Sequence, residues 1–206
     1  MNNSNQIKKF ASYFNDDSLV LFPTDTVVGL GCRFDSATAI AKIRKLKGIV
    51  GKNPMAILIS DLSQLDLLQV RRSKLSNLIM QKFWPGGVTI VLTSEIALPC
   101  SGESNSIGLR MPDSEVLRKI IDKVGVPLAA TSANLHGQPA PARMPEVSLY
   151  FRNEVDQVIE FEITPVSLAS TVISIEAGNL RVIREGAVTK EDLYNAIGDR
   201  FEPSEI

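Results

Sequence analysis

The amino-acid sequence predicts an α/β protein built on an open sheet. Short apolar runs typical of strands alternate along the chain with segments in which apolar residues recur at helical spacing. The composition, with 44% hydrophobic and 22% charged residues in a chain of 206, is typical of a protein that buries a core. Because no shift in composition marks a boundary, residues 1–206 are expected to form one domain.

The first half of the chain predicts three helices and three strands. Each helix carries apolar residues three or four positions apart, as Ile40 and Ile43 show in the second one. The third helix ends before Pro85-Gly86-Gly87, a strong breaker, and Trp84 at its end is expected in the core. The expected helices are 7–14, 36–47 and 73–84, and the expected strands are 18–22, 54–59 and 88–93.

The second half continues this alternation on both sides of a loop. Three prolines exclude regular structure over residues 137–145. A closing helix is expected after Thr189, because Thr189-Lys190-Glu191-Asp192 has the spacing of a capping box. The expected strands are 106–110, 126–130, 155–161, 171–175 and 180–184, with a helix over 114–123 and a short helix after the loop.

Bulk properties exclude several classes of protein. The formal net charge of -1 argues against a nucleic-acid footprint over the whole surface, but not against a local basic patch. Cys32 and Cys100 form no CxxC pair and the single histidine is His136, so no metal site is expected and a reduced, cytoplasmic protein is the simple interpretation. Neither a secretory signal nor an apolar run of about 18 residues is visible, so no membrane span is expected.

The first strand runs into a segment that combines hydroxyls and glycines, Pro23-Thr24-Asp25-Thr26-Val27-Val28-Gly29-Leu30-Gly31. The helix that follows carries a cluster of basic residues toward and beyond its end: Lys42, Arg44, Lys45, Lys47 and Lys52. Hydroxyls and glycines at a strand end, with lysines nearby, are what a site for an anionic small molecule requires. The alternative is a solvated basic helix end, which the helix dipole favours.

Three further segments fit such a site. Arg110 closes the strand Ser106–Arg110, and a guanidinium there can hold a carboxylate with two parallel hydrogen bonds, or it can make a surface salt bridge. Thr131-Ser132-Ala133-Asn134 can bring amides and hydroxyls to a ligand, or it can be a simple turn. Ser170-Thr171-Val172-Ile173 is the third segment.

In this order, the segments resemble the YrdC-like family of threonylcarbamoyl-AMP synthases, from about Leu19 to about Ala187. The short form of the family is the closest match, because the long form continues into a further domain and this chain stops at Ile206. The resemblance implies an open, twisted, mixed sheet with packed helices and a concave ligand-binding face. It also implies a cytoplasmic enzyme that converts L-threonine, bicarbonate and ATP, with Mg²⁺ on the phosphates, into threonylcarbamoyl-AMP and pyrophosphate for tRNA modification.

The resemblance also implies roles for individual residues. Lys47 and Lys52 would be catalytic residues at the phosphates. The threonine-binding residues would be Thr24, Thr26, Arg110, Thr131 and Ser170. The ATP-binding residues would be Ser106, Ser132, Asn134, Arg143 and Arg184. No residue is expected to ligate a metal, and none forms a covalent intermediate.

The sequence departs from the family at three positions. Ile49 replaces the arginine of a Lys-x-Arg motif, and an isoleucine cannot neutralise phosphate. Lys52, Arg143 or Arg184 would have to compensate for it. Val28 replaces a tyrosine of the amino-acid pocket, and His136 stands where serine is usual and is expected to be a loop residue without a role.

Other functions stay open. One is an RNA-binding or ribosome-associated module that uses a basic concave face without chemistry, and another is a diverged paralogue with weak or no synthase activity. A third is an adenylate-hydrolysing or carbamoyl-transferring relative, because the same fold occurs inside hydrogenase-maturation carbamoyltransferases. The synthase would have small-molecule substrates, protein partners that pass the threonylcarbamoyl group to tRNA, and possible contact with tRNA itself.

Overall fold

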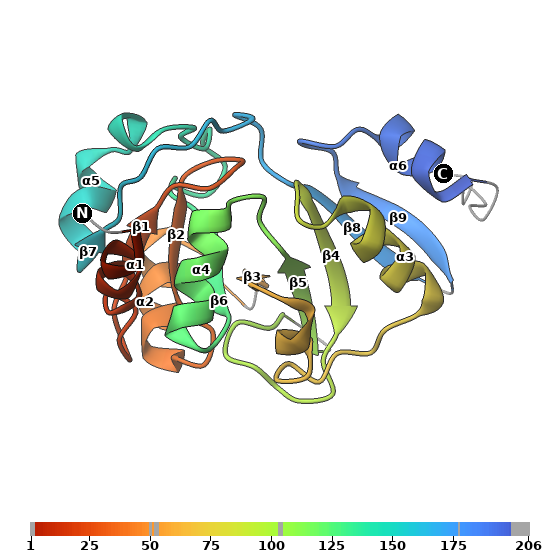
Figure 1. Ribbon diagram of the computed structural model, residues 1–206, viewed down its shortest axis with the longest axis horizontal. Helices are drawn as coiled ribbons and strands as arrows, with labels where there is room; N and C mark the ends of the chain where they lie inside the picture. The colour runs from red at the N-terminus through yellow and green to blue at the C-terminus, as the bar shows by residue number, and fades with distance from the viewer. Residues whose placement is uncertain (1–2, 50, 52–53, 103–104, 177, 199–206) are drawn as a thin grey trace.

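The described chain forms one mixed nine-stranded sheet with helices packed on it (Figure 1), as a computed structural model shows for residues 3–49, 51, 54–102, 105–176 and 178–198. The strand order is β7-β1-β2-β6-β3-β5-β4-β8-β9. Three neighbouring pairs are parallel, β1 with β7, β3 with β5 and β4 with β8, and the other five are antiparallel. The expected open α/β sheet is confirmed.

Strands and helices are interspersed along the chain, and the longer connections precede β5, η3 and β8. The strands are β1 Val20–Phe22, β2 Gly29–Arg33, β3 Ala56–Leu58, β4 Val88–Thr93, β5 Ser106–Arg110, β6 Leu128–Ser132, β7 Gln157–Val158, β8 Thr171–Glu176 and β9 Asn179–Arg184. The helices are α1 Asn3–Ala11, α2 Ala37–Leu46, α3 Lys74–Phe83, α4 Glu115–Val124, α5 Leu149–Glu154 and α6 Lys190–Ile197. Within the described ranges, 3-10 turns lie at η1 Leu62–Leu65 and η3 Met144–Glu146.

Most expected elements are confirmed, and β2, η1 and η3 were missed. Strands β4 and β5 have the expected bounds, and side chains of Ser36, Ser73 and Ser114 cap α2, α3 and α4. The capping box of α6 is present, with reciprocal contacts between Thr189 and Asp192. Strand β2 was not expected, because its Gly-Leu-Gly start lacks the β-branched and aromatic residues that mark strands. The short turn η1 was not expected either. The turn η3 begins at Met144, inside the stretch 137–145 that was expected to lack regular structure. Pro145 is tolerated there because it stands at the start of the turn.

Alternation along the strands gives the sheet two different faces. In β3, Ile57 points to one face, whereas Ala56 and Leu58 point to the other. The face with Ile57 is covered by apolar residues of α2, α3 and α6. The opposite face is covered by α1 and α4, which pack on Phe22, Leu58 and Leu128.

Where α1 and α4 do not cover this second face, small residues leave a depression in it. They are Gly29, Ala56, Gly108 and Ala130, from four neighbouring strands. A Cβ atom at Gly29 would lie 2.7 Å from the ring of Phe22, and one at Gly108 would lie 3.1 Å from Cγ2 of Thr89. Larger side chains would therefore displace their neighbours or fill the hollow.

The single tryptophan and the cysteines support the core. Trp84 was expected in the core and is half-buried against it, with its Nε1 donating to the carbonyl oxygen of Val88 at 2.7 Å. Cys32 and Cys100 are both free thiols and fully buried. Among the described residues, no helix has the length and apolar character needed to cross a membrane.

The cysteines give a test of this packing. Burial, as the largest cause, raises the pKa of the Cys32 thiol to about 12 and that of Cys100 to about 11. Because the thiolate is the reactive form, a disulfide reagent at about pH 8 should modify neither thiol in the folded protein and both in denaturant. Absorbance of the released chromophore would follow the reaction. Rapid modification of the native protein would contradict the buried positions.

Candidate functional site

A cavity of about 230 Å³ occupies the hollow in the second face of the sheet. Segments far apart in the sequence meet at its walls. The predicted site residues that line it are Thr24, Thr26, Arg110, Thr131, Ser132, Ser170 and Arg184. Lys47, Ser106, Asn134 and Arg143 do not line it, and Lys52 lies outside the described residues. The sequence-predicted segments therefore converge, but not every predicted side chain reaches the same space.

Two arginines stand at the ends of one row of residues across the sheet. Arg184 in β9 pairs with Val172 in β8, which pairs with Thr89 in β4. Continued by one residue, the β4–β5 register places Thr89 beside Arg110. Three strand spacings of about 4.8 Å separate the two arginine backbones by about 14 Å. All four residues line the cavity, so a ligand lying along the row can meet a cation at each end.

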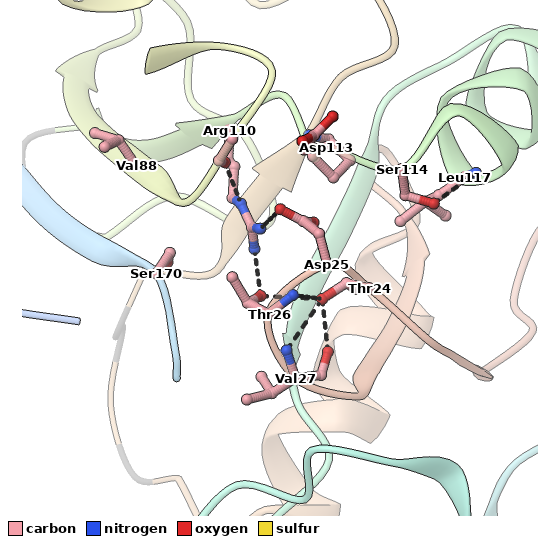
Figure 2. A network of polar contacts seen from close by, with 12 residues as sticks. Thr24, Asp25, Thr26, Val27, Val88, Arg110, Asp113, Ser114, Leu117 and Ser170 are labelled. Atoms are coloured by element: carbon pink, nitrogen blue, oxygen red, sulfur yellow. Dashed lines mark hydrogen bonds and ion pairs between the residues drawn. The ribbon is translucent and has the colours of Figure 1, made fainter. Parts of the chain in front are cut away.

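The side chain of Arg110 is held by two segments of the chain, the turn after β1 and Gly86 before β4 (Figure 2). Its Nε donates to the carbonyl oxygen of Gly86 at 2.9 Å, Nη1 to Oγ1 of Thr26 at 2.7 Å and Nη2 to Oδ2 of Asp25 at 2.6 Å. Arg110 is only 5% exposed, and burial lowers its pKa although Asp25 opposes this effect. A guanidinium has five N–H groups, so one on Nη1 and one on Nη2 are left for a ligand.

The hydroxyl protons beside Arg110 have a fixed direction. Oγ1 of Thr24 donates to the carbonyl oxygen of Val27 at 2.6 Å, so in its 3.0 Å contact with Oγ1 of Thr26 the proton must come from Thr26. Oγ1 of Thr24 also accepts from the amides of Thr26 and Val27. Neither threonine keeps a proton for a ligand. Thr26 keeps one lone pair, and both side chains shape the wall.

The second arginine and hydroxyls on both sides of β5 complete the cavity wall. Oγ of Ser170 lies 2.8 Å from Oγ1 of Thr89. The carbonyl oxygen of Ser170 accepts a hydrogen bond from Nη2 of Arg184 at 2.8 Å. Thr131 and Ser132 lie on the other side of Arg110, half-buried at the end of β6, two strands from β5 in the direction away from Arg184. Their hydroxyls make no hydrogen bond to the part of the chain that the structure describes. These two groups are therefore available to a ligand.

Lys47 holds a turn rather than facing the cavity. It is 4% exposed, and its Nζ donates to the carbonyl oxygens of Ser132 and Asn134, at 2.5 and 2.6 Å, with Oδ1 of Asn134 at 3.4 Å. Its own carbonyl oxygen accepts from the amide of His136 at 3.3 Å. Burial lowers the pKa of Lys47 to about 8. The end of α2 is thereby fastened to the turn that follows β6.

The remaining predicted residues lie around the cavity. Asn134 donates through Nδ2 to the carbonyl oxygens of Leu135 and Gln138, beside a second cavity. Ser106 lies on the face of β5 that carries Gly108, two residues further along the strand. Arg143 is exposed where η3 begins, and His136 is exposed in its loop.

The structure explains why an apolar residue is suited to position 49. The amide of Gly48 donates to the carbonyl oxygen of Lys45, and the amide of Ile49 donates to that of Arg44 at 2.9 Å. With Gly48 at φ +67°, this is a Schellman motif, in which the residue after the glycine is commonly apolar. Ile49 is half-buried and is not among the residues that line the cavity. The half-buried Arg44 of the basic cluster donates through Nη2 to the carbonyl oxygen of Ser101 at 3.4 Å.

Sequence reasoning missed two functional candidates. Asp25 pairs with Arg110, and Thr89 pairs with Ser170 in the cavity wall. Asp25 stands between Thr24 and Thr26, which were both predicted site residues. If Arg110 had been expected to be buried, its need for a carboxylate partner could have pointed to Asp25. Thr89 lies in an apolar strand run and carries no local signal.

The buried ammonium of Lys47 leads to a pH-dependent prediction. Its pKa is about 8 in the folded protein and ordinarily 10.5, so between these values the unfolded chain binds more protons. The contribution of Lys47 to stability is therefore present above about pH 10.5 and is lost as the pH falls through 8. Compared with Lys47→Met, the free energy of unfolding of the wild type should rise by about 2 kcal/mol between about pH 8 and pH 10.

Urea denaturation of the wild type and of Lys47→Met at both pH values measures this difference. The contributions of all other titrating groups are the same in the two proteins and cancel. A difference that does not change with pH would show that the three oxygen acceptors hold the pKa of Lys47 at its ordinary value.

Comparison with known proteins agrees with the geometry. The model of the Sua5/YciO/YrdC family, described as "Telomere recombination", matches residues 12–186. The threonylcarbamoyl-AMP synthase of Bacillus subtilis is 32% identical over 205 residues, which cover 95% of this chain and 58% of that protein. The synthase of Pyrococcus abyssi is 31% identical over 202 residues, covering 97% and 59%. The chain thus spans less than two thirds of the length of these two relatives.

The fold matches a solved structure over nearly all of the chain. P. abyssi Sua5 complexed with L-threonine superimposes with a TM-score of 0.87 at 30% identity, covering 96% of this chain and 59% of that one. A family model that matches well over half of the sequence and this shared architecture lead to the same assignment. The chain belongs to the Sua5/YciO/YrdC family.

Proposed function

We propose that the protein is an L-threonylcarbamoyladenylate synthase, a nucleotidyltransferase that makes threonylcarbamoyl-AMP and pyrophosphate from L-threonine, bicarbonate and ATP. The observation that carries the proposal is the cavity itself, with a guanidinium at each end of one row across the sheet and hydroxyls between them. The threonylcarbamoyl-AMP synthases among its relatives favour this activity over others that an anion-binding cavity could support.

The chemistry explains why two separate cations are needed. A carbamate attached to a carboxylate has to approach a polyphosphate, and the reactants repel one another unless fixed positive groups compensate their charges. In the proposed pose the amino-acid carboxylate takes the two remaining N–H groups of Arg110, and Arg184 meets the phosphates. Ser170 and Thr131 would contact the amino acid, and Ser132 the nucleotide.

Several residues keep more distant roles in this proposal. Lys47 can reach a phosphate only by leaving the carbonyl oxygens of Ser132 and Asn134, so a catalytic role would require the turn to rearrange. Ser106, Asn134 and Arg143 would contact ATP where it extends beyond the cavity. Lys52 stays a predicted phosphate ligand.

Mg²⁺ would come with ATP rather than reside in the protein. The residues that line the cavity offer hydroxyl and carbonyl oxygens, but no carboxylate is among them. Within the described residues, no group of three histidines, cysteines or acids could hold a metal ion. This donor set does not fit a resident Mg²⁺, which prefers carboxylates and substrate phosphates.

Pyrophosphate release from ATP tests the function directly. Release should require threonine and bicarbonate together, and it should stop when either is left out. ATP cleavage indifferent to threonine would contradict the synthase. Salt-sensitive RNA binding without ATP cleavage would instead favour an RNA-binding module, and transfer to tRNA with added partner proteins would place the product in the modification pathway.

The two arginines should separate the two substrates. Arg110→Ala would leave Asp25 buried without a partner, so Arg110→Lys is the better variant, because it keeps the charge but loses the planar fork. It should raise the KM for threonine about tenfold or more and leave that for ATP nearly unchanged, whereas Arg184→Ala should do the reverse. These changes correspond to about 1.5 to 3 kcal/mol for a charge-assisted contact.

Arg181→Ala, on the same strand as Arg184 but not among the residues lining the cavity, is the matched control. Titrating each substrate at saturating levels of the others measures the effects. Equal weakening of both substrates by one variant would show that its arginine has been assigned to the wrong end.

A further inference from the structure

Asp25 lies directly behind the guanidinium that faces the cavity. Asp25 is 8% exposed and Arg110 is 5% exposed, and their contact is 2.6 Å long. Arg110 lines the cavity, whereas Asp25 does not, so a ligand touches the cation and has the carboxylate behind it. The more exposed carboxylate of Asp113 also lies near Arg110 and attracts its positive charge (Figure 2). This end of the cavity is therefore close to neutral overall, although it presents N–H donors.

The opposite end has a different electrostatic character. Within the described part of the chain, Arg184 donates to the carbonyl oxygen of Ser170 and forms no ion pair with a carboxylate. Its positive charge is thus not compensated by a neighbouring acid. An anion with more than one negative charge gains most at this end, because Coulomb attraction scales with the product of the charges.

The bonding of Asp25 indicates that its charge matters as well as its shape. Oδ2 accepts from Arg110, but Oδ1 is buried and has no hydrogen-bond partner among the described residues. Leaving a buried carboxylate oxygen without a donor is unfavourable, and an uncharged side chain could accept the single bond from Nη2. What a neutral acceptor could not supply is compensation for the cation.

We propose that Asp25 is a positioning residue that sets specificity through Arg110: it aims the guanidinium and cancels its excess charge, so that this end accepts the carboxylate of an amino acid and rejects phosphate. The proposal rests on the proposed function for the identity of the amino acid. The carboxylate is recognised by the geometry of the two N–H groups. A phosphate would gain little net attraction there and is left to Arg184.

Asp25→Asn tests the proposal, and Asp35→Asn is the matched control. Asp35 pairs with Arg33 at 2.8 Å and neither residue lines the cavity, so the control removes the same charge from an ion pair elsewhere. Calorimetric titration with inorganic phosphate at constant ionic strength is the first measurement. Asp25→Asn should bind phosphate about tenfold more tightly than wild type, and Asp35→Asn should not.

The second measurement is competition on the wild-type protein, which needs no variant to fold. Inorganic phosphate should displace ATP without displacing threonine, whereas in Asp25→Asn it should displace both. Phosphate that competes with threonine in wild type, or unchanged phosphate affinity in a folded Asp25→Asn, would overturn the proposal.

The two proposals fail in distinguishable ways. Wild-type protein that binds no threonine would count against the synthase, whereas the phosphate titrations of Asp25→Asn and Asp35→Asn use phosphate alone and still decide the role of Asp25. A purely structural role of Asp25 would lower the melting temperature of the variant without raising its phosphate affinity.

Discussion

The buried ion pair between Arg110 and Asp25 is the interaction on which the cavity depends. It joins the end of β5 to the turn after β1, and through Nε it also holds Gly86 before β4. The amide of Gly86 donates in return to the carbonyl oxygen of Met111, so the two turns are fixed together. Either partner alone would be a buried, uncompensated charge. A substitution of Arg110 or Asp25 that changes the cavity wall is therefore expected to lower the stability of the fold as well.

The two faces of the sheet explain where a cavity could form. One face is filled from edge to edge by apolar residues under α2, α3 and α6. On the other, α1 and α4 cover the β1–β6 side, and the small residues Gly29, Ala56 and Gly108 leave the centre open. Leu58 and Ala130 belong both to the packing under α4 and to the cavity wall. The helices that stabilise the sheet therefore also set the size of the site.

The sequence predicted those parts of the molecule whose signals are local. Helix starts at Ser36, Ser73 and Ser114 could be predicted because capping depends on a few neighbouring residues. The strand β2 could not, because its glycines are required by contact with Phe22, a residue of another strand. Among the site residues, Arg110 and Ser170 were predicted from their segments, whereas their partners Asp25 and Thr89 depend on which strands lie side by side.

Lys47 shows most clearly why side-chain roles were harder to predict than segments. A lysine at a helix end can reach a ligand or a backbone oxygen, and the path of the turn after β6 decides which. Three cations near the site then differ in what holds them. Arg110 has a carboxylate, Lys47 has three oxygens of one turn, and Arg184 has a single carbonyl oxygen. Arg184 thus needs the least rearrangement to meet an anion. In the proposed function, it would therefore serve the phosphates without an arginine at position 49.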